Sequence, residues 1–274
     1  LIHDALILGI KDFFHKNGFS KAVLGLSGGI DSALVAALST EALGKENVLG
    51  ILMPSRFSTD HSVKDAVDLA RNLGIAHETL AIKEIYDAFL STLQPVFKDA
   101  PFNVAEENLQ ARIRGTLVMA ISNKFGHILL NTSNKSEAAV GYGTLYGDMC
   151  GSLSVLGDVY KTEVYKLSRY INRERELIPE NTITKAPSAE LHPDQKDQDS
   201  LPEYDILDAI LKLYIEDNQS KQDIIKQGFA PALVEKTLAL VNRNEYKRAQ
   251  CPPILKVSKK SFGSGRRMPL TAKL

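Results

Sequence analysis

The 274-residue sequence contains no tryptophan and only two cysteines, Cys150 and Cys251. Two cysteines exclude a disulfide framework and a cysteine-based metal cluster, and they favour a reducing compartment such as the cytoplasm. An excess of charge is also missing, because 33 Lys and Arg residues balance 33 Asp and Glu residues. The sequence therefore lacks the overall basic field that would favour nucleic acid or an anionic membrane as a partner.

Long apolar runs are absent as well, since none approaches the roughly 18 residues that would suggest a membrane span. The chain is 44% hydrophobic and 24% charged, which is typical of a globular domain with a sizeable core. The sequence begins at Leu1, without an initiator methionine. We therefore expect residues 1–274 to form a single domain that belongs to a longer protein.

Short apolar runs alternate with stretches of helical periodicity through the first half of the chain. The runs predict strands and the periodic stretches predict helices, two of which have polar N-caps, Ser58 or Thr59 and Asn103. This alternation predicts an α/β fold, in which a parallel sheet carries helices on both faces. The predicted strands are 21–26, 47–53, 76–82 and 127–132, and the predicted helices are 2–14, 32–43, 59–73, 83–96 and 103–125.

The remainder of the chain is predicted to be mainly helical. Asp158 is a suitable N-cap for an amphipathic helix over 159–171. Residues 204–246 are helical again, and Pro231 fits a first helical turn.

Two segments of this second half lack a packing pattern. Residues 179–202 are rich in Pro, Asp, Lys, Ser and Thr, and long loops inside compact domains are usually functional or disordered. We predict a mobile lid over about 184–201. The basic tail, about 256–274, is predicted to be flexible.

The stretch SGGIDS follows the first predicted strand and opens the next helix. A glycine turn at a helix N-terminus gathers free N–H groups, which together with the helix dipole favour a phosphate. Asp31 would repel phosphate unless it binds Mg²⁺, which prefers oxygen ligands. The alternative is a tight turn with Asp31 or Ser32 as N-cap. No Gly-Lys-Ser/Thr follows, so the stretch is not a Walker loop.

SGGIDS resembles the pyrophosphatase loop of the ATP-pyrophosphatase family, which includes NAD synthetase, GMP synthetase and asparagine synthetase. Three further stretches narrow this choice: EENLQARIRGTLVMAISN (106–123), LLNTSNKSEAAVGYGTLYGDMCGSLSVLGDVYKTEV (129–164) and NEYKRAQCPP (244–253). Together they look like NAD synthetase, and they are closest to the synthetase domain of its glutamine-dependent form. The resemblance implies an adenine-nucleotide α-hydrolase-like fold.

The resemblance also implies a reaction, the ATP-dependent amidation of deamido-NAD. The nicotinate carboxylate attacks the α-phosphate of ATP and releases pyrophosphate, and ammonia then displaces AMP to form the amide of NAD. Mg²⁺ is the implied cofactor, because it offsets the charge of pyrophosphate. The alternatives are another ATP-pyrophosphatase, such as a GMP synthetase, and a regulatory module that binds ATP without turnover.

The resemblance assigns one group of residues to ATP and metal. Asp31 and Glu137 match the metal carboxylates of the family. Glu137 would otherwise be a solvated acid in a first helical turn. Lys161 and Ser188 match phosphate contacts, although Lys161 could also be a cation on an exposed helix face. The ATP-binding residues implied are Gly25, Ser27, Gly28, Gly29, Ile30, Asp31, Ser32, Thr132, Lys161 and Ser188.

A second group is assigned to deamido-NAD and to catalysis. The deamido-NAD residues implied are Asn108, Arg112, Glu137 and Lys247, and the catalytic ones are Asp148, Lys161 and Ser188. Asp148 matches an aspartate that orients ammonia, or it only stabilises its glycine-rich turn. Arg114 points to another side of the helix and is interpreted as a surface residue. Leu145 and Ser152 stand where the ammonia-dependent relatives have a lysine and an aspartate, and both differences go with the glutamine-dependent branch.

The resemblance further implies partners. The family is dimeric, so we expect a homodimer or a higher homo-oligomer. In the glutamine-dependent form a glutaminase domain precedes the synthetase domain, and we expect it upstream in the full-length protein, where it supplies ammonia. No nucleic-acid or membrane partner is expected.

Overall fold

A five-stranded sheet forms the centre of the computed structural model, which describes residues 1–193 and 195–271. The strand order is β3-β2-β1-β4-β5, and all neighbouring strands run parallel. The strands are β1 (Ala22–Gly25), β2 (Val48–Leu52), β3 (Ala76–Thr79), β4 (Ile128–Asn131) and β5 (Leu153–Ser154). The four predicted strands are confirmed, whereas β5 was missed because two residues carry no periodic pattern.

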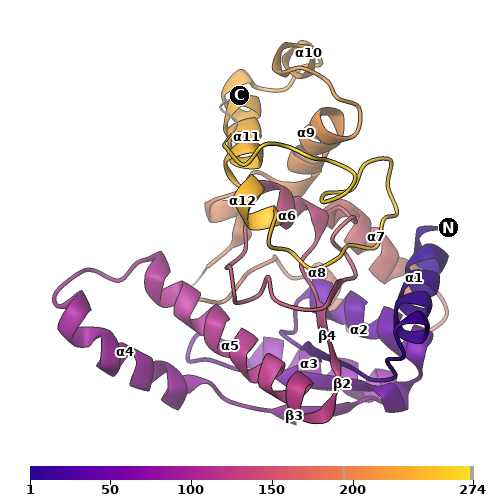
Figure 1. Cartoon of the computed structure of the whole chain (residues 1–274), viewed down its shortest axis with the longest axis vertical. Helices are drawn as coiled ribbons and strands as arrows, with labels where there is room; N and C mark the ends of the chain where they lie inside the picture. Colours follow the sequence, from indigo (N-terminus) through magenta and orange to yellow (C-terminus); the bar gives the residue numbers. More distant parts are fainter. Residues whose placement is uncertain (194, 272–274) are drawn as a thin grey trace.

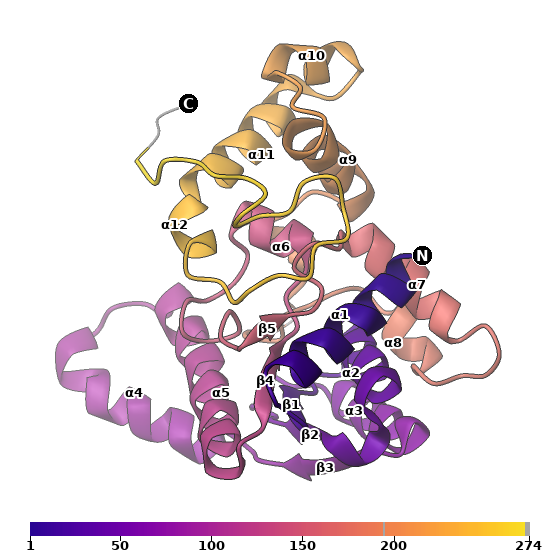
Figure 2. The same cartoon turned by 45° about the vertical axis from the view of Figure 1, so that its right-hand side comes forward.

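Helices cover both faces of this sheet, as predicted (Figure 2). On one face, α5 (Val104–Phe125) packs on β1 and β4 and carries α4 (Lys83–Phe97). The other face holds α1 (Ile2–Lys16), α2 (Ile30–Leu43), α3 (Asp60–Leu73) and α7 (Lys161–Ile171). The alternation of β1 explains this arrangement, because Val23 faces the α5 side while Ala22 and Leu24 face the α2 side.

The N-caps predicted for two helices are confirmed. The Thr59 hydroxyl accepts the Ser62 N–H at 3.2 Å and begins α3. The Asn103 side chain accepts the Ala105 N–H at 2.8 Å and begins α5, where Glu106 completes a capping box. These caps need only neighbouring residues, which is why sequence alone predicts them.

The prediction for Asp158 was wrong. Helix α7 begins at Lys161 and its N-cap is Tyr160. The fully buried Asp158 carboxylate instead accepts the N–H groups of Val257 and Ser258, both at 2.8 Å. These partners lie about a hundred residues further along the chain, so a local capping pattern cannot reveal them.

A second layer of helices stands above the sheet (Figure 1). The predicted helical region 204–246 consists of separate helices, and Pro231 occupies the first turn of one of them, as expected. They pack around buried side chains that include Leu207, Leu211 and Val241. The helices of this layer are α6 (Lys135–Val140), α9 (Tyr204–Ile215), α10 (Lys221–Lys226), α11 (Pro231–Arg243) and α12 (Glu245–Arg248).

The two segments without a packing pattern are partly ordered by tertiary contacts. The short helix α8 (Glu180–Thr184) and a 3₁₀ turn at Asp197–Asp199 lie within 179–202. In the tail, Phe262 is 3% exposed and packs with the α9 core. Residue 194 of the predicted lid and residues 272–274 of the predicted tail lie outside the described residues. None of the described helices is both long and apolar enough to cross a membrane.

Candidate active site

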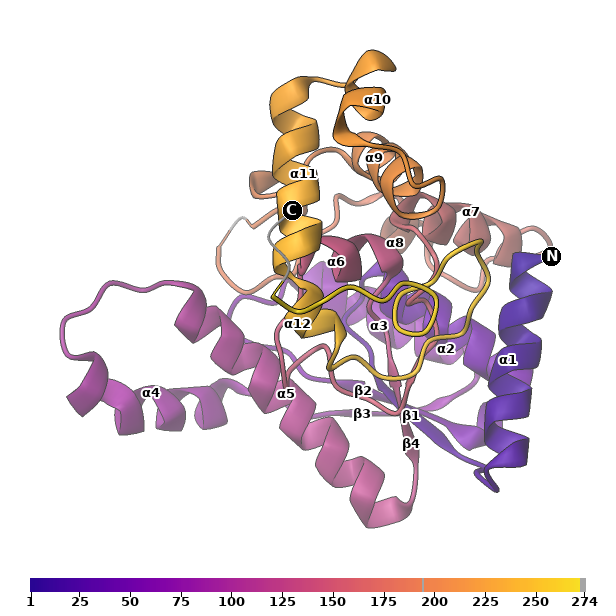
Figure 3. The same cartoon turned by 45° about the horizontal axis from the view of Figure 1, so that its top comes forward.

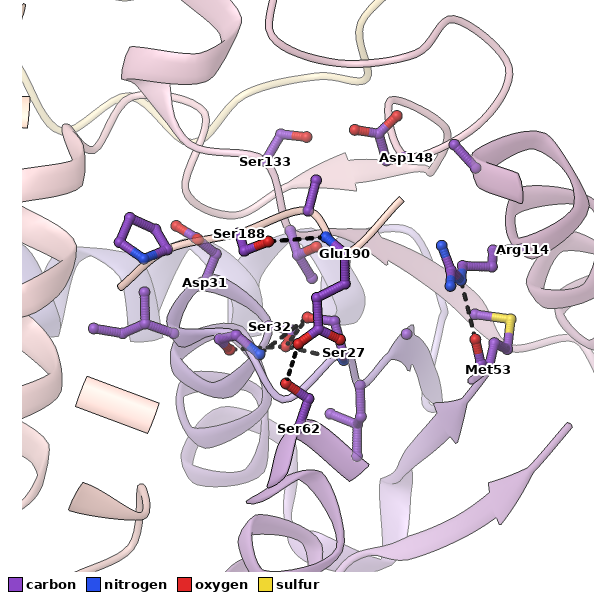
Figure 4. Close-up of a pocket in the computed structure, with 18 of the residues that line it drawn as sticks. Ser27, Asp31, Ser32, Met53, Ser62, Arg114, Ser133, Asp148, Ser188 and Glu190 are labelled. Carbon is purple, nitrogen blue, oxygen red and sulfur yellow. Dashed lines mark hydrogen bonds between the residues drawn. The ribbon is translucent and has the colours of Figure 1, made fainter. Parts of the chain in front are cut away.

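A cavity of about 330 Å³ opens at the carboxyl ends of the central strands (Figure 4). It lies where the strand order changes direction between β1 and β4, which is where parallel sheets bind ligands. Most of the residues predicted for ATP, metal and catalysis line it: Gly25, Ser27, Gly29, Ile30, Asp31, Ser32, Thr132, Glu137, Asp148, Lys161 and Ser188.

The SGGIDS loop forms one wall of the cavity at the start of α2. The Gly29 N–H donates to Ser27 Oγ at 3.1 Å, and the Ser32 hydroxyl donates to the Gly29 carbonyl at 3.0 Å. Gly29 is the N-cap, so the alternative in which Asp31 or Ser32 caps the helix was wrong. Asp31 is thereby free to point its carboxylate at other elements. The 14-residue helix directs its positive end at the cavity.

Gly28 does not line the cavity and has a different task. Its φ is +79°, and a Cβ atom there would lie 2.2 Å from the Ser62 carbonyl oxygen. Only glycine permits this conformation and this close approach. Gly28 therefore seats the loop against the start of α3 and brings Ser62 to the cavity.

Lys161 lies between two carboxylates in the depth of the site. Its ammonium is 2.5 Å from Asp31 Oδ2 and 3.3 Å from Glu137 Oε1. Lys161 is 2% exposed, so the alternative of a cation on an exposed helix face was wrong. Asn134 completes the cluster, because its side-chain N–H donates to Asp31 Oδ1 at 2.8 Å.

The charge of this cluster depends on the protonation of Glu137. Burial, followed by the neighbouring Asp31 carboxylate, raises the pKa of Glu137 to about 8. Burial opposes the charge of Lys161, but the carboxylates of Asp31 and Glu137 outweigh it and raise the pKa of Lys161. At neutral pH the Asp31 carboxylate and the Lys161 ammonium therefore balance, and a cation bound beside them would favour ionisation of Glu137, which would then give the cluster one net negative charge. Magnesium commonly binds one or two carboxylates together with substrate phosphates, so these residues fit it.

Asp148 lines the same cavity from the loop that follows α6. Its carboxylate accepts the Thr144 N–H at 2.6 Å, and burial raises the pKa of Asp148. It therefore stabilises its own turn and also faces the cavity, so the two interpretations of this residue are compatible.

Three residues predicted for deamido-NAD lie outside the cavity lining. Lys247 donates to the carbonyls of Gly141 and Gly143, both at 2.8 Å. Asn108 accepts the Thr144 hydroxyl at 2.6 Å, and Arg112 donates to the Leu145 carbonyl at 3.2 Å. All three hold the loop 141–148, which carries Asp148.

Arg114 was misread as a surface residue. It lines the cavity, and its Nε donates to the Met53 carbonyl at 3.0 Å, just beyond β2 (Figure 4). Burial lowers the pKa of Arg114 to about 10, so it stays charged at neutral pH. Among the described residues no carboxylate lies within salt-bridge distance of it. The spacing from Arg112 on α5 could have signalled a second side of the helix, but not that this side faces a cavity.

Glu190 also lines the cavity, and the sequence analysis did not predict it as a site residue. Its carboxylate accepts the Ser62 hydroxyl at 2.6 Å and the Thr59 hydroxyl at 3.0 Å, beside the SGGIDS loop (Figure 4). The Glu190 backbone has a φ of +49°, and its N–H donates to Ser188 Oγ at 3.1 Å. The Glu190 carboxylate thus accepts hydrogen bonds from two hydroxyl groups that lie near the predicted phosphate-binding loop.

The segment 185–191 crosses the mouth of the cavity and is tied on both sides. The Lys185 ammonium lies 3.1 Å from Asp65 Oδ2 and 3.0 Å from Ser62 Oγ. On the opposite side, Gln110 donates to the Leu191 carbonyl at 2.8 Å. Residues 185–191 of the predicted lid therefore contribute to the cavity lining, and the mobility of this segment stays a prediction.

A family model described as NAD synthase matches residues 2–251. The chain belongs to the NAD synthase family. The match covers the loop at Ser27, the Asp31–Glu137–Lys161 cluster and the lid segment, so the family spans both walls of the cavity.

Relatives within the NAD synthase family are similar over almost the whole chain. The glutamine-dependent NAD(+) synthetase of Synechocystis sp. is 59% identical over 266 residues, which cover 97% of this chain and 48% of the relative. The chain thus spans about half the length of the curated relatives it matches.

Solved structures of NAD synthetases share the fold. Glutamine-dependent NAD+ synthetase from Acinetobacter baumannii, in complex with ADP, has a TM-score of 0.67 at 45% identity, covering 98% of this chain and 49% of that one. The NH3-dependent NAD synthetase from Campylobacter jejuni has a TM-score of 0.73 at 32% identity, covering 93% and 97%.

Proposed function

We propose that this chain catalyses the ATP-dependent amidation of deamido-NAD to NAD, with ammonia as the nitrogen donor. The observation that supports it best is the meeting of the SGGIDS loop with the Asp31–Glu137–Lys161 cluster in one cavity of an NAD synthase chain. The nicotinate carboxylate oxygen attacks the α-phosphorus of ATP, and the bond to the β-phosphate breaks to release pyrophosphate. Ammonia then attacks the carbonyl carbon, AMP leaves with the electrons of the broken C–O bond, and the nitrogen releases one proton to give the amide.

The chain's own groups fit the charge that this reaction develops. The free N–H groups at the start of α2 and the ammonium of Lys161 stabilise negative charge on the phosphates. The Ser188 hydroxyl, on the lid segment, adds a donor from the other side. A lid that excludes water protects the adenylate from hydrolysis.

Asp31 and Glu137 are the residues that would hold Mg²⁺. When bound there, it offsets the charge of the leaving pyrophosphate. Asp148, whose side chain is accessible at the cavity wall, accepts N–H bonds from ammonia and orients it toward the carbonyl carbon. Asn108, Arg112 and Lys247 shape the loop 141–148, against which deamido-NAD binds.

The partners are proposed on the same basis. The curated relatives are about twice as long as this chain, which supports a glutaminase domain in cis that supplies ammonia from glutamine. A cytoplasmic location is proposed on the small number of cysteines. Helices α4 and α5 project from the body, and α4 exposes Phe89 and Val96 at 46% and 75% (Figure 3). This apolar surface supports a homodimer or higher homo-oligomer. A GMP synthetase is not favoured, because the matching family is NAD synthase.

Incubation of the purified 274-residue chain with ATP, Mg²⁺, ammonium and deamido-NAD tests the proposal. We expect NAD, AMP and pyrophosphate in equal amounts, more at alkaline pH because more ammonia is then unprotonated. With glutamine in place of ammonium, and contaminating ammonia removed, we expect almost no NAD. AMP formation with another acceptor, but none with deamido-NAD, would contradict the substrate, and glutamine-driven NAD formation would contradict the assignment of this chain to the synthetase half.

A further inference from the structure

The cluster at the centre of the cavity depends on two short backbone segments that meet below it. Glu137 comes from the first turn of α6, and Lys161 is the first residue of α7. The two helix starts are joined directly, because the Lys161 N–H donates to Ser136 Oγ at 2.9 Å. Any shift between them would change the 3.3 Å contact of Lys161 with Glu137.

One carboxylate from a third element holds both helix starts. Asp208, on α9, accepts the Ser136 hydroxyl on Oδ1 at 2.5 Å and the Thr162 N–H on Oδ2 at 2.9 Å. Asp208 is 5% exposed and does not line the cavity. Its carboxylate therefore binds the Ser136 hydroxyl and the Thr162 N–H, and it does not contact a substrate in that cavity.

Asp208 differs in this from the other buried acids nearby. Asp158 and Glu216 both pair with the buried Lys135 at 2.8 Å, one residue before Ser136. That ion pair network fixes α6 against the tail. Within the described residues Asp208 has no such cation, and its charge is balanced by a hydroxyl and an N–H of the two helix starts.

We propose that Asp208 is a positioning residue for the amidation reaction, because its carboxylate sets Glu137 on α6 and Lys161 on α7 in register. The inference rests on the proposed function, since the register matters only if these two groups act on the same phosphates. Removal of the carboxylate leaves the hydrogen bonds within the SGGIDS loop in place. It frees α7 to shift relative to α6 and so misplaces the Lys161 ammonium.

The test compares the kcat of two variants, Asp208→Ala and Asp208→Asn, with that of a control. The control is Asp205→Ala, because Asp205 is an exposed acid on the same helix. For Asp208→Ala we expect kcat to fall by ~100-fold, since a displacement on the order of 1 Å at a reacting group has that effect. ATP binding by calorimetry keeps its stoichiometry, and the affinity falls by much less than kcat, because the N–H groups of the SGGIDS loop are kept while the Lys161 ammonium is displaced. Asp208→Asn recovers most of the loss, because its amide still bonds to Thr162 N–H and Ser136 Oγ. Asp205→Ala leaves kcat unchanged.

A second control separates positioning from stability. Leu207 is fully buried on the same helix and packs in the upper core, so Leu207→Val lowers the thermal midpoint without removing a hydrogen bond of the two helix starts. We expect it to keep kcat, whereas Asp208→Ala loses kcat at a similar midpoint. If both variants lose kcat in proportion to their midpoints, or if Asp208→Ala keeps kcat, the proposal is overturned.

Two outcomes remain, and both are decisive. If Asp208→Ala fails to fold, Ser136→Ala breaks the same bridge, and its kcat is expected to fall without loss of ATP stoichiometry; an unchanged kcat would contradict the proposal. If the unsubstituted chain makes no NAD at all, the proposed function fails, which is a different result from a variant that behaves like the unsubstituted chain.

Discussion

The ATP side and the deamido-NAD side of the cavity are built in different ways. On the ATP side, residues of one contiguous motif line the cavity, and Lys161 from 130 residues away joins Asp31 there. On the other side, Asn108, Arg112 and Lys247 lie behind the loop 141–148 and bond to its backbone and hydroxyl groups. One side therefore presents side chains to a ligand, and the other presents a loop held in shape from behind.

This difference shows when a sequence motif predicts the direction of its side chains. A loop between a strand end and a helix start has its geometry fixed by its neighbours, so its side chains go where the motif implies. Residues on separate helices reach a ligand only if the intervening loop allows it. Substitutions on each side of the cavity test whether the two sides differ in this way.

The largest effect is expected at the metal cluster on the ATP side. Asp31→Asn or Glu137→Gln removes one of the two carboxylates that face Lys161, and we expect adenylation to fall by ~1000-fold or more, as for loss of a preorganised charge. The fold should be nearly unchanged. Pyrophosphate release is the measurement, with Asp12→Asn as control, because Asp12 is a partly exposed acid on α1 that pairs with Lys16. Near-normal release in either variant would remove that residue from the metal role.

A pair of arginines compares the two sides directly. Arg114→Met removes a buried cation from the cavity, and we expect the KM for ATP to rise by roughly 10-fold or more, the size of a charge-assisted hydrogen bond. Arg112→Met loosens the Leu145 carbonyl, so the KM for deamido-NAD rises instead. Initial rates at varied concentrations of each substrate separate the two. If both variants change the same KM, the two sides are not distinct.

Asp148 provides a pH test of the loop. Burial raises the pKa of Asp148 in the folded chain, so its contribution to stability is present below the unfolded pKa and is lost as pH rises through the folded pKa. Asp148→Asn keeps an oxygen that accepts the Thr144 N–H and has no charge to bury. We expect its thermal midpoint to exceed that of the unsubstituted chain at pH 8 but not at pH 3, while NAD formation falls. If the thermal midpoints of the two chains differ equally at pH 8 and at pH 3, desolvation of the ionised Asp148 carboxylate does not destabilise the folded chain.

The smallest effect is expected at the lid. Glu190→Gln weakens the bonds to Ser62 and Thr59 and removes a negative charge next to the phosphate loop, so ATP affinity should rise by about 3- to 10-fold, the range of one modest hydrogen bond. Calorimetry measures it, with the exposed Glu203→Gln as control. The predicted mobility of 184–201 is checked by proteolysis, which ATP and deamido-NAD together should slow. Lower affinity in Glu190→Gln would indicate that Glu190 assists binding.

Local interactions explain what could be predicted from the sequence. The caps at Thr59 and Asn103, the first four strands and the parallel α/β arrangement follow from periodicity and neighbouring polar groups. The gathering of Ser27, Asp31 and Ser32 at the cavity follows from their place between a strand and a helix. The family resemblance added Glu137 and Lys161, and their meeting with Asp31 required no correction.

Only the tertiary structure decided the contacts between residues far apart in sequence. Asp158 does not cap a helix, and its carboxylate accepts hydrogen bonds from backbone N–H groups of the tail. Arg114 and Glu190 face the cavity because α5 and the lid segment approach it from opposite sides. Asp208 meets two helix starts that lie 72 and 46 residues before it. The physical reason is that a buried polar group must find its partner wherever packing places one, and no local pattern records which distant residue that is.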